Sequence, residues 1–97
     1  MTEDYKLFLI DTNILIYAYD KEDIIKHKIA KDLMKQVFDN KINLAISNQN
    51  LAEFVSASIR KIKLDFAQTK IIIDDIINHN GFKKINYSAE TILLAIN

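Results

Sequence analysis

Cysteine, proline and tryptophan are absent from this 97-residue chain, and glycine occurs once. Without cysteine, neither a disulfide bond nor a thiolate metal site can form. The two histidines, His27 and His79, are too few for a histidine-based zinc site without help from carboxylates. Asparagine must supply most turns, because it tolerates the left-handed backbone better than other non-glycine residues.

Long apolar runs and an excess of charge of either sign are also missing. No run reaches the roughly 18 residues that a membrane span needs, and no segment has the pattern of a signal peptide. The 13 basic and 13 acidic residues give a net charge of zero. This balance excludes the global positive field of a dedicated nucleic-acid binder, but not a local basic patch. We therefore expect a cytoplasmic protein with no membrane partner.

Hydrophobic residues, at 49%, and charged residues, at 27%, are balanced as in a folded globular chain. At this length we expect a single domain over residues 1–97. Apolar periodicity predicts the order β-α-α-β-α-α-β-α, and hence an α/β fold with a small parallel sheet sandwiched by helices. The strands are expected at 5–10, 42–46 and 82–87, and the helices at 14–19, 20–38, 48–62, 65–78 and 89–96. The nearly all-apolar first strand is typical of one covered on both faces.

Local signals predict how several helices begin and end. The acids between Asp20 and Asp23 are expected in the first turn of the second helix, where the helix dipole favours them. Either Ser47 or Asn48 caps the third helix, and Asp65 with Gln68 resembles a capping box for the fourth. Gly81 is suited to a left-handed C-terminal position. One face of the second helix is expected to hold its apolar residues: Ile24, Ile25, Ile29, Ala30, Leu33, Met34, Val37 and Phe38.

Two acids are the main candidates for chemistry. Asp11 follows the first strand, at the place where open α/β sheets bind ligands, and Glu53 lies on the third helix. Two carboxylates converging there would attract a hard divalent cation. Alternatively, Asp11 caps a helix and Glu53 belongs to a solvated helix face. Thr12 and Asn13 could orient Asp11 or a bound water by hydrogen bonding.

The remaining polar candidates have simpler interpretations. Asp74 and Asp75 point about 100° apart on a helix, so we expect surface charges and not a chelating pair. His27 is conceivable as a general base, but a surface or partly buried position is the simpler expectation. A short basic cluster either contacts phosphates or is a solvated charge run; it comprises Arg60, Lys61 and Lys63.

The segment 9–17, with Asp11-Thr12-Asn13 directly after an apolar strand, resembles the opening of PIN-domain proteins, in particular the VapC-type toxin ribonucleases of toxin–antitoxin pairs. The similarity continues through the helix that contains His27 and a strand ending in Ser47. It then reaches a helix with a single acid, Glu53. The order of these motifs extends over essentially the whole chain. The resemblance implies a PIN-like fold and metal-assisted hydrolysis of RNA phosphodiester bonds.

The resemblance also implies roles for individual residues. Asp11 and Glu53 would be the catalytic residues and the ligands of Mg²⁺ or Mn²⁺, with Thr12, Asn13 and Ser47 orienting ligands or water. The partners would be an RNA substrate and an antitoxin protein. The family adds one or two further aspartates and its final strands after the last helix seen here, and this chain has neither. We therefore expect a C-terminally truncated copy, active or inactive, that forms a homodimer to cover the apolar edge at 5–10.

Other classes of function stay open at this point. One is a non-catalytic PIN-like interaction module that binds an antitoxin-like helix in an apolar groove. Another is an α/β phosphatase with Asp11 as nucleophile, although such enzymes generally have a second aspartate where this chain has Asn13. The last is a small α/β domain with no surviving site. Divalent-cation binding that depends on both Asp11 and Glu53 would distinguish the nuclease from the others.

Overall fold

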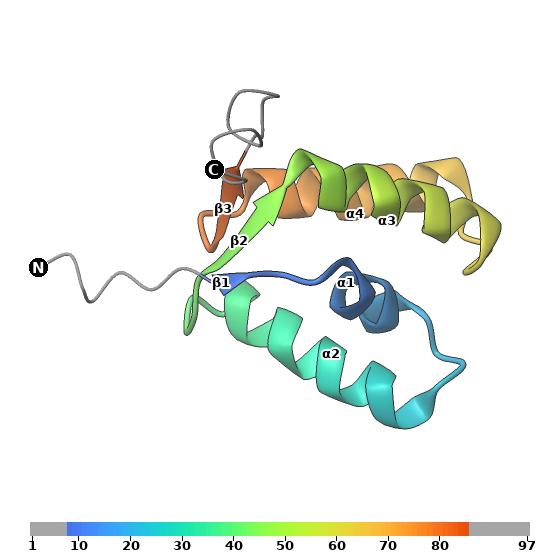
Figure 1. The fold of residues 1–97 in the computed structure, drawn as a ribbon, viewed down its shortest axis with the longest axis horizontal. Coiled ribbons are helices and arrows are strands. Elements are labelled where there is room, and N and C mark those ends of the chain that lie inside the picture. Colours follow the sequence, from blue (N-terminus) through green and yellow to red (C-terminus); the bar gives the residue numbers. More distant parts are fainter. Residues whose placement is uncertain (1–7, 86–97) are drawn as a thin grey trace, which may run out of the picture.

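The computed structural model describes residues 8–85, which form a parallel three-stranded sheet and four helices (Figure 1). The α/β class and the predicted element order are confirmed from the first strand to the third, and the helix expected at 89–96 lies outside the described residues. The elements are β1 (Phe8–Leu9), α1 (Thr12–Tyr19), α2 (Ile24–Phe38), β2 (Leu44–Ser47), α3 (Asn48–Arg60), α4 (Phe66–Asn78) and β3 (Phe82–Ile85).

The strands pair in the order β1-β2-β3, so β2 is central. Leu44 of β2 lies opposite Phe8 on one side and Phe82 on the other. All four residues of β2 are buried, but Phe8 and Leu9 are 66% and 49% exposed. The expectation that the first strand is covered on both faces is therefore wrong for these two residues. They lie at the edge of the described sheet, and the next residue, Ile10, enters the core.

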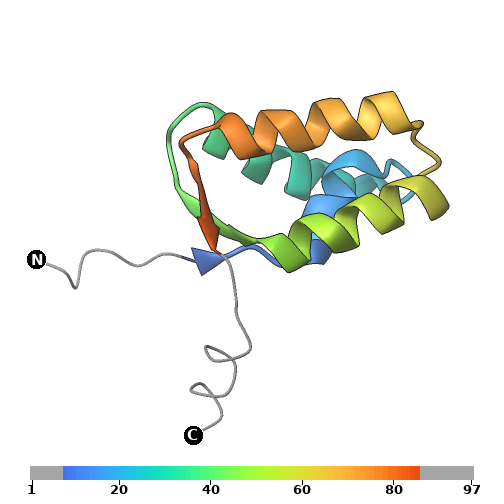
Figure 2. The ribbon, with the colours of Figure 1, turned by 90° about the horizontal axis from the view of Figure 1, so that it is seen from above.

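The helices lie on both sides of the sheet. In Figure 1, α3 and α4 are in the upper part of the molecule and α1 and α2 in the lower part, and in both views the strands are at one end (Figure 2). The core between these layers is apolar: Ile10, Leu15, Ala18, Ala30, Met34, Val37, Leu44, Ile46, Phe54, Ile76 and Phe82. Among residues 8–85, no helix has both the length and the apolar character that crossing a membrane requires.

Helix α2 differs from its prediction in two ways. It begins at Ile24, with Asp23 as the cap that accepts a hydrogen bond from the Lys26 amide, so no acid lies in its first turn. Asp20 instead ends α1. The apolar residues do not share one face: Ala30, Met34 and Val37 are buried, whereas Ile24, Ile25 and Ile29 are exposed. The expected single face is wrong because the core reaches only one side of α2.

The other caps follow the sequence signals closely, with one exception. Ser47 caps α3, and Asp65 with Gln68 forms the capping box of α4. Gly81 does not have a positive φ, so its predicted left-handed conformation is wrong. The glycine is needed because a Cβ there would lie 2.8 Å from the Val37 side chain. Positive φ values occur at Asn40, as the scarcity of glycine predicts, and at Lys63.

Candidate functional site

The candidate site forms where β1 and β2 end and α1 and α3 begin. Because the strands are parallel, their carboxyl ends meet at one edge of the sheet, and Asp11 and Ser47 follow or end neighbouring strands there. Both residues cap the helices that come next. The chain therefore brings two helix N-termini to the same edge.

Asp11 is an exposed residue that caps α1. Its Oδ1 accepts a hydrogen bond from the Asn13 amide at 2.9 Å, so the capping alternative is confirmed. A cap of this kind stabilises a helix by about 1 kcal/mol. One carboxylate oxygen is enough for this contact, and capping thus leaves the second oxygen for a ligand.

Glu53 is directed towards α1. Its Oε1 accepts a hydrogen bond of 2.7 Å from the Thr12 hydroxyl, across 41 positions of the sequence. The backbone of Thr12 follows Asp11 directly, so this contact holds the second acid beside the first. Glu53 is exposed, as expected for a solvated helix face, and it also lines the pocket at this edge.

A buried capping box lies behind these acids. The Ser47 hydroxyl and backbone amide both donate to Asn50 Oδ1 at 2.9 Å, and the Asn50 backbone amide donates back to Ser47 Oγ at 3.0 Å. The Asn50 side chain then donates from Nδ2 to the Thr12 hydroxyl at 2.8 Å. Polar contacts therefore run without a break from the end of β2 to Glu53.

A shallow pocket of about 440 Å³ lies over this edge, and both acids line it. Arg60 lines it as well, seven positions after Glu53 and hence two helical turns along the same side of α3. The full lining is Asp11, Thr12, Asn13, Ile16, Glu53, Ser56, Ala57 and Arg60. The Arg60 charge and the positive end of the α1 dipole both offset the two carboxylates.

The structure thus brings four of the five predicted site residues to one pocket. Ser47 is the exception: it is buried and reaches the pocket through Asn50. Asn50, which makes this connection, was not among the predicted site residues. The available signal was the spacing of a capping box, Ser47 followed by a hydrogen-bonding side chain at the third helical position.

The other candidates lie away from this pocket. His27 is partly buried, and its Nδ1 is 2.8 Å from the Tyr17 carbonyl oxygen. Asp74 pairs with Lys70 on the exposed side of α4, and its neighbour Asp75 is also exposed, as expected for surface charges. Asp20, Glu22 and Asp23 line a different groove.

The acidic side chains that line the pocket are Asp11 and Glu53. Within residues 8–85, no group of three or more acidic or histidine side chains is arranged to hold an ion. Two carboxylates in an open pocket nevertheless fit Mg²⁺, which keeps several water ligands and often takes one or two carboxylates together with substrate phosphates. The donor set is thus compatible with an ion that binds together with its substrate.

Comparisons of this chain with protein-family models, with curated proteins and with solved structures found no match.

Proposed function

We propose that this chain is a PIN-like domain of the VapC type, a metal-dependent endoribonuclease that hydrolyses RNA phosphodiester bonds. One observation carries the proposal: Asp11 and Glu53, far apart in sequence, line one pocket and are linked through the Thr12 hydroxyl. Capping of α1 accounts for Asp11, but it does not account for a second exposed acid, Glu53, at the same carboxyl edge of the sheet. That edge is where α/β folds bind ligands.

The roles of the residues follow from their chemistry. Asp11 and Glu53 would hold Mg²⁺ or Mn²⁺, which supplies activation of water and neutralises charge on the phosphate. Arg60 would bind a non-bridging phosphate oxygen, because a guanidinium matches phosphate geometry. Asn13 would orient water or the Asp11 carboxylate from the pocket wall.

The direct test is Mn²⁺-dependent cleavage of a mixed single-stranded RNA. We expect cleavage by the unmodified chain, and its loss in Asp11→Asn and in Glu53→Gln. Asp74→Asn is the matched control, since it also removes one carboxylate from an exposed helix position. Arg60→Gln should raise KM more than it lowers kcat. A folded chain without cleavage, or cleavage that survives both site variants, would contradict the proposal.

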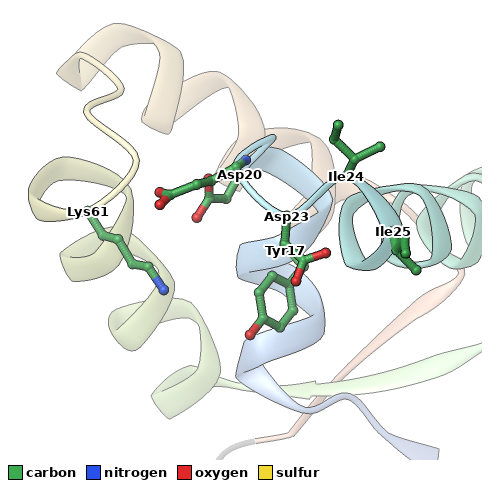
Figure 3. A pocket seen from close by; sticks show the side chains of 7 residues that line it. Tyr17, Asp20, Asp23, Ile24, Ile25 and Lys61 are labelled. Carbon is green, nitrogen blue, oxygen red and sulfur yellow. The ribbon is translucent and has the colours of Figure 1, made fainter.

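A non-catalytic interaction module is the second candidate, and a different observation favours it. A groove of about 760 Å³ lies at the start of α2, between the exposed Ile24 and Ile25 and an acidic rim (Figure 3). These isoleucines are 77% and 72% exposed. Glu22 and Asp23 are the exposed acids of the rim, Asp20 is a buried acid of the lining, and Lys61 adds one basic side chain to it. The combination fits an amphipathic helix that carries basic residues beside its apolar face, as an antitoxin-like partner would.

This second candidate has its own test. A synthetic amphipathic helix with leucines on one face and flanking lysines should bind the unmodified chain, measured by fluorescence anisotropy. Ile24→Ser combined with Ile25→Ser should weaken binding at least tenfold, and Ile71→Ser, which changes an exposed isoleucine on α4, should not. Equal binding by all three proteins would contradict a partner site in this groove.

The homodimer stays a prediction. Phe8 and Leu9 are exposed at the edge of the described sheet, and such an edge favours pairing with another strand. Sedimentation equilibrium of the chain and of Phe8→Lys would test it: we expect a dimer that the charged residue converts to monomer.

A further inference from the structure

Asn50 is a buried amide in the first turn of α3, 8% exposed, for which capping alone does not account. A capping box needs only its Oδ1, which accepts from the Ser47 amide. The Ser47 backbone N–H can only donate, so the orientation of the Asn50 amide is fixed by its partner. Nδ2 must then point the other way, and there it meets the Thr12 hydroxyl at 2.8 Å.

This fixed orientation determines where the Thr12 proton lies. Thr12 Oγ1 accepts from Asn50 Nδ2, which cannot accept in return. The hydroxyl proton is therefore directed to Glu53 Oε1, at 2.7 Å. Three side-chain hydrogen bonds run in one direction, from Ser47 through Asn50 and Thr12 to Glu53. The series ends on the carboxylate that lines the pocket.

We propose that Asn50 is a positioning residue that acts through Thr12 to hold one oxygen of Glu53, so that the other oxygen serves a divalent cation in the pocket. The inference rests on the proposed function. Its physical basis is that an exposed glutamate is otherwise free to rotate about three torsions, and fixing it before the ion arrives lowers the cost of binding. Groups that orient ligands in this way typically change metal affinity by about 10- to 100-fold.

The sharpest variant is Asn50→Asp. It keeps an acceptor for both Ser47 donors, so the capping box survives, but the second oxygen cannot donate to Thr12. The Thr12 proton then turns to the introduced carboxylate and away from Glu53. Thr12→Val removes the hydroxyl at nearly constant volume, and Thr12→Ser is the matched control that retains it.

The experiment is titration of the full chain and these variants with Mn²⁺, followed by water-proton relaxation. We expect Asn50→Asp and Thr12→Val each to weaken binding about tenfold or more, and Thr12→Ser to stay within about twofold. Because Asn50 acts through Thr12, the double variant should bind no more weakly than Thr12→Val alone. In variants that keep Asn50, its side-chain amide protons should also report the contact by NMR. Their chemical shifts in Thr12→Val should differ from those in the unmodified chain, and in Thr12→Ser they should be close to those in the unmodified chain.

The possible failures are distinguishable. If the unmodified chain binds no Mn²⁺, either alone or with a short single-stranded RNA present, the proposed function is overturned and this inference with it. If it binds Mn²⁺ but Asn50→Asp binds equally or more tightly, only the positioning role is overturned. Additive losses in the double variant, or an Asn50 amide signal insensitive to Thr12→Val, would also overturn it.

Discussion

The two ends of the sheet are built in different ways. At the carboxyl end, α1 and α3 are joined by hydrogen bonds between polar side chains, and two carboxylates remain exposed. At the amino end, where α2 meets the start of β3, Gly81 packs directly against Val37. His79 accepts from the Gly81 amide at 2.9 Å through Nδ1, and its Nε2 is 3.0 Å from the Phe38 carbonyl oxygen. The His79 ring also packs edge-on against Phe38.

This difference separates stability from chemistry. At the amino end, both ring nitrogens of His79 have partners within the fold. At the carboxyl end, the buried polar groups are paired, but the exposed carboxylates of Asp11 and Glu53 can still bind a ligand. A site that binds and releases a ligand needs such polar atoms without a partner in the fold. Leaving them unpaired costs little stability where the packing around them does not depend on their contacts. Substitutions at the two ends should therefore affect different measurements.

Gly81→Ala should have the largest effect on folding. The new Cβ would lie 2.8 Å from both Val37 Cγ1 and the Val37 carbonyl oxygen, and the backbone oxygen cannot move aside without displacing the end of α2. Overpacking of this kind costs about 1–3 kcal/mol, and we expect the upper part of that range. Urea denaturation followed by circular dichroism measures the loss.

Asn80→Ala is the control for this prediction, because it introduces the same side chain one position earlier, at an exposed residue. We expect it to change the free energy of unfolding by no more than about 0.5 kcal/mol. Should the two variants unfold alike, the close contact at the amino end would not be the source of stability that the comparison assigns to it.

The sequence predicted those parts of the molecule that depend on local signals. Strand and helix order follow from periodicity, and the Asp65 cap follows from its spacing to Gln68. Gly81 was identified as special for the wrong reason, since its constraint is the approach of Val37 from a distant helix. The exposure of Ile24 was missed because periodicity cannot tell which apolar residues find a partner.

The candidate site shows the same limit. Asp11 and Glu53 were chosen from residue type and position, and their common pocket depends on how α1 and α3 pack. Asn50 could not be recognised as a link, because its partner Thr12 is 38 positions away. Contacts of this length appear only when the sheet has aligned the two helix starts.

A smaller effect, visible only in alkali, is expected at Tyr19, the last residue of α1, whose ring packs against Phe54. Burial raises the pKa of Tyr19 above its ordinary value of 10.0, and the nearby Asp75 carboxylate raises the pKa further. The unfolded chain therefore releases the phenol proton at a lower pH than the folded protein does. Above about pH 10, the free energy of unfolding should consequently fall as the pH rises.

Tyr19→Phe should remove this contribution. The stability of the variant relative to the unmodified chain should thus increase between pH 8 and pH 11, measured by urea denaturation at both values. Asp75→Asn should reduce the same pH dependence in part, because it removes the second cause. If the difference in the free energy of unfolding between Tyr19→Phe and the unmodified chain does not change with pH, the phenol has the same pKa in the folded and unfolded states. In that case the Tyr19 phenol would contribute as little to stability as the exposed groups at the carboxyl end.

The smallest effect on stability is expected at Asp11 and Glu53, where the effect on the proposed RNA cleavage should be largest. Asp11→Asn keeps a good cap, since asparagine and aspartate are about equally favourable at this position. Glu53→Gln keeps a carbonyl oxygen that can accept from Thr12. We expect each variant to change the free energy of unfolding by no more than about 0.5 kcal/mol at pH 7, measured by urea denaturation.

A loss of stability above about 2 kcal/mol in either variant would mean that the carboxylates hold α1 and α3 together. A loss of RNA cleavage in that variant would then report unfolding and not chemistry. Stability unchanged together with cleavage abolished would place the acids among the groups that act on substrate, and would make the contrast between the two ends of the sheet a functional one.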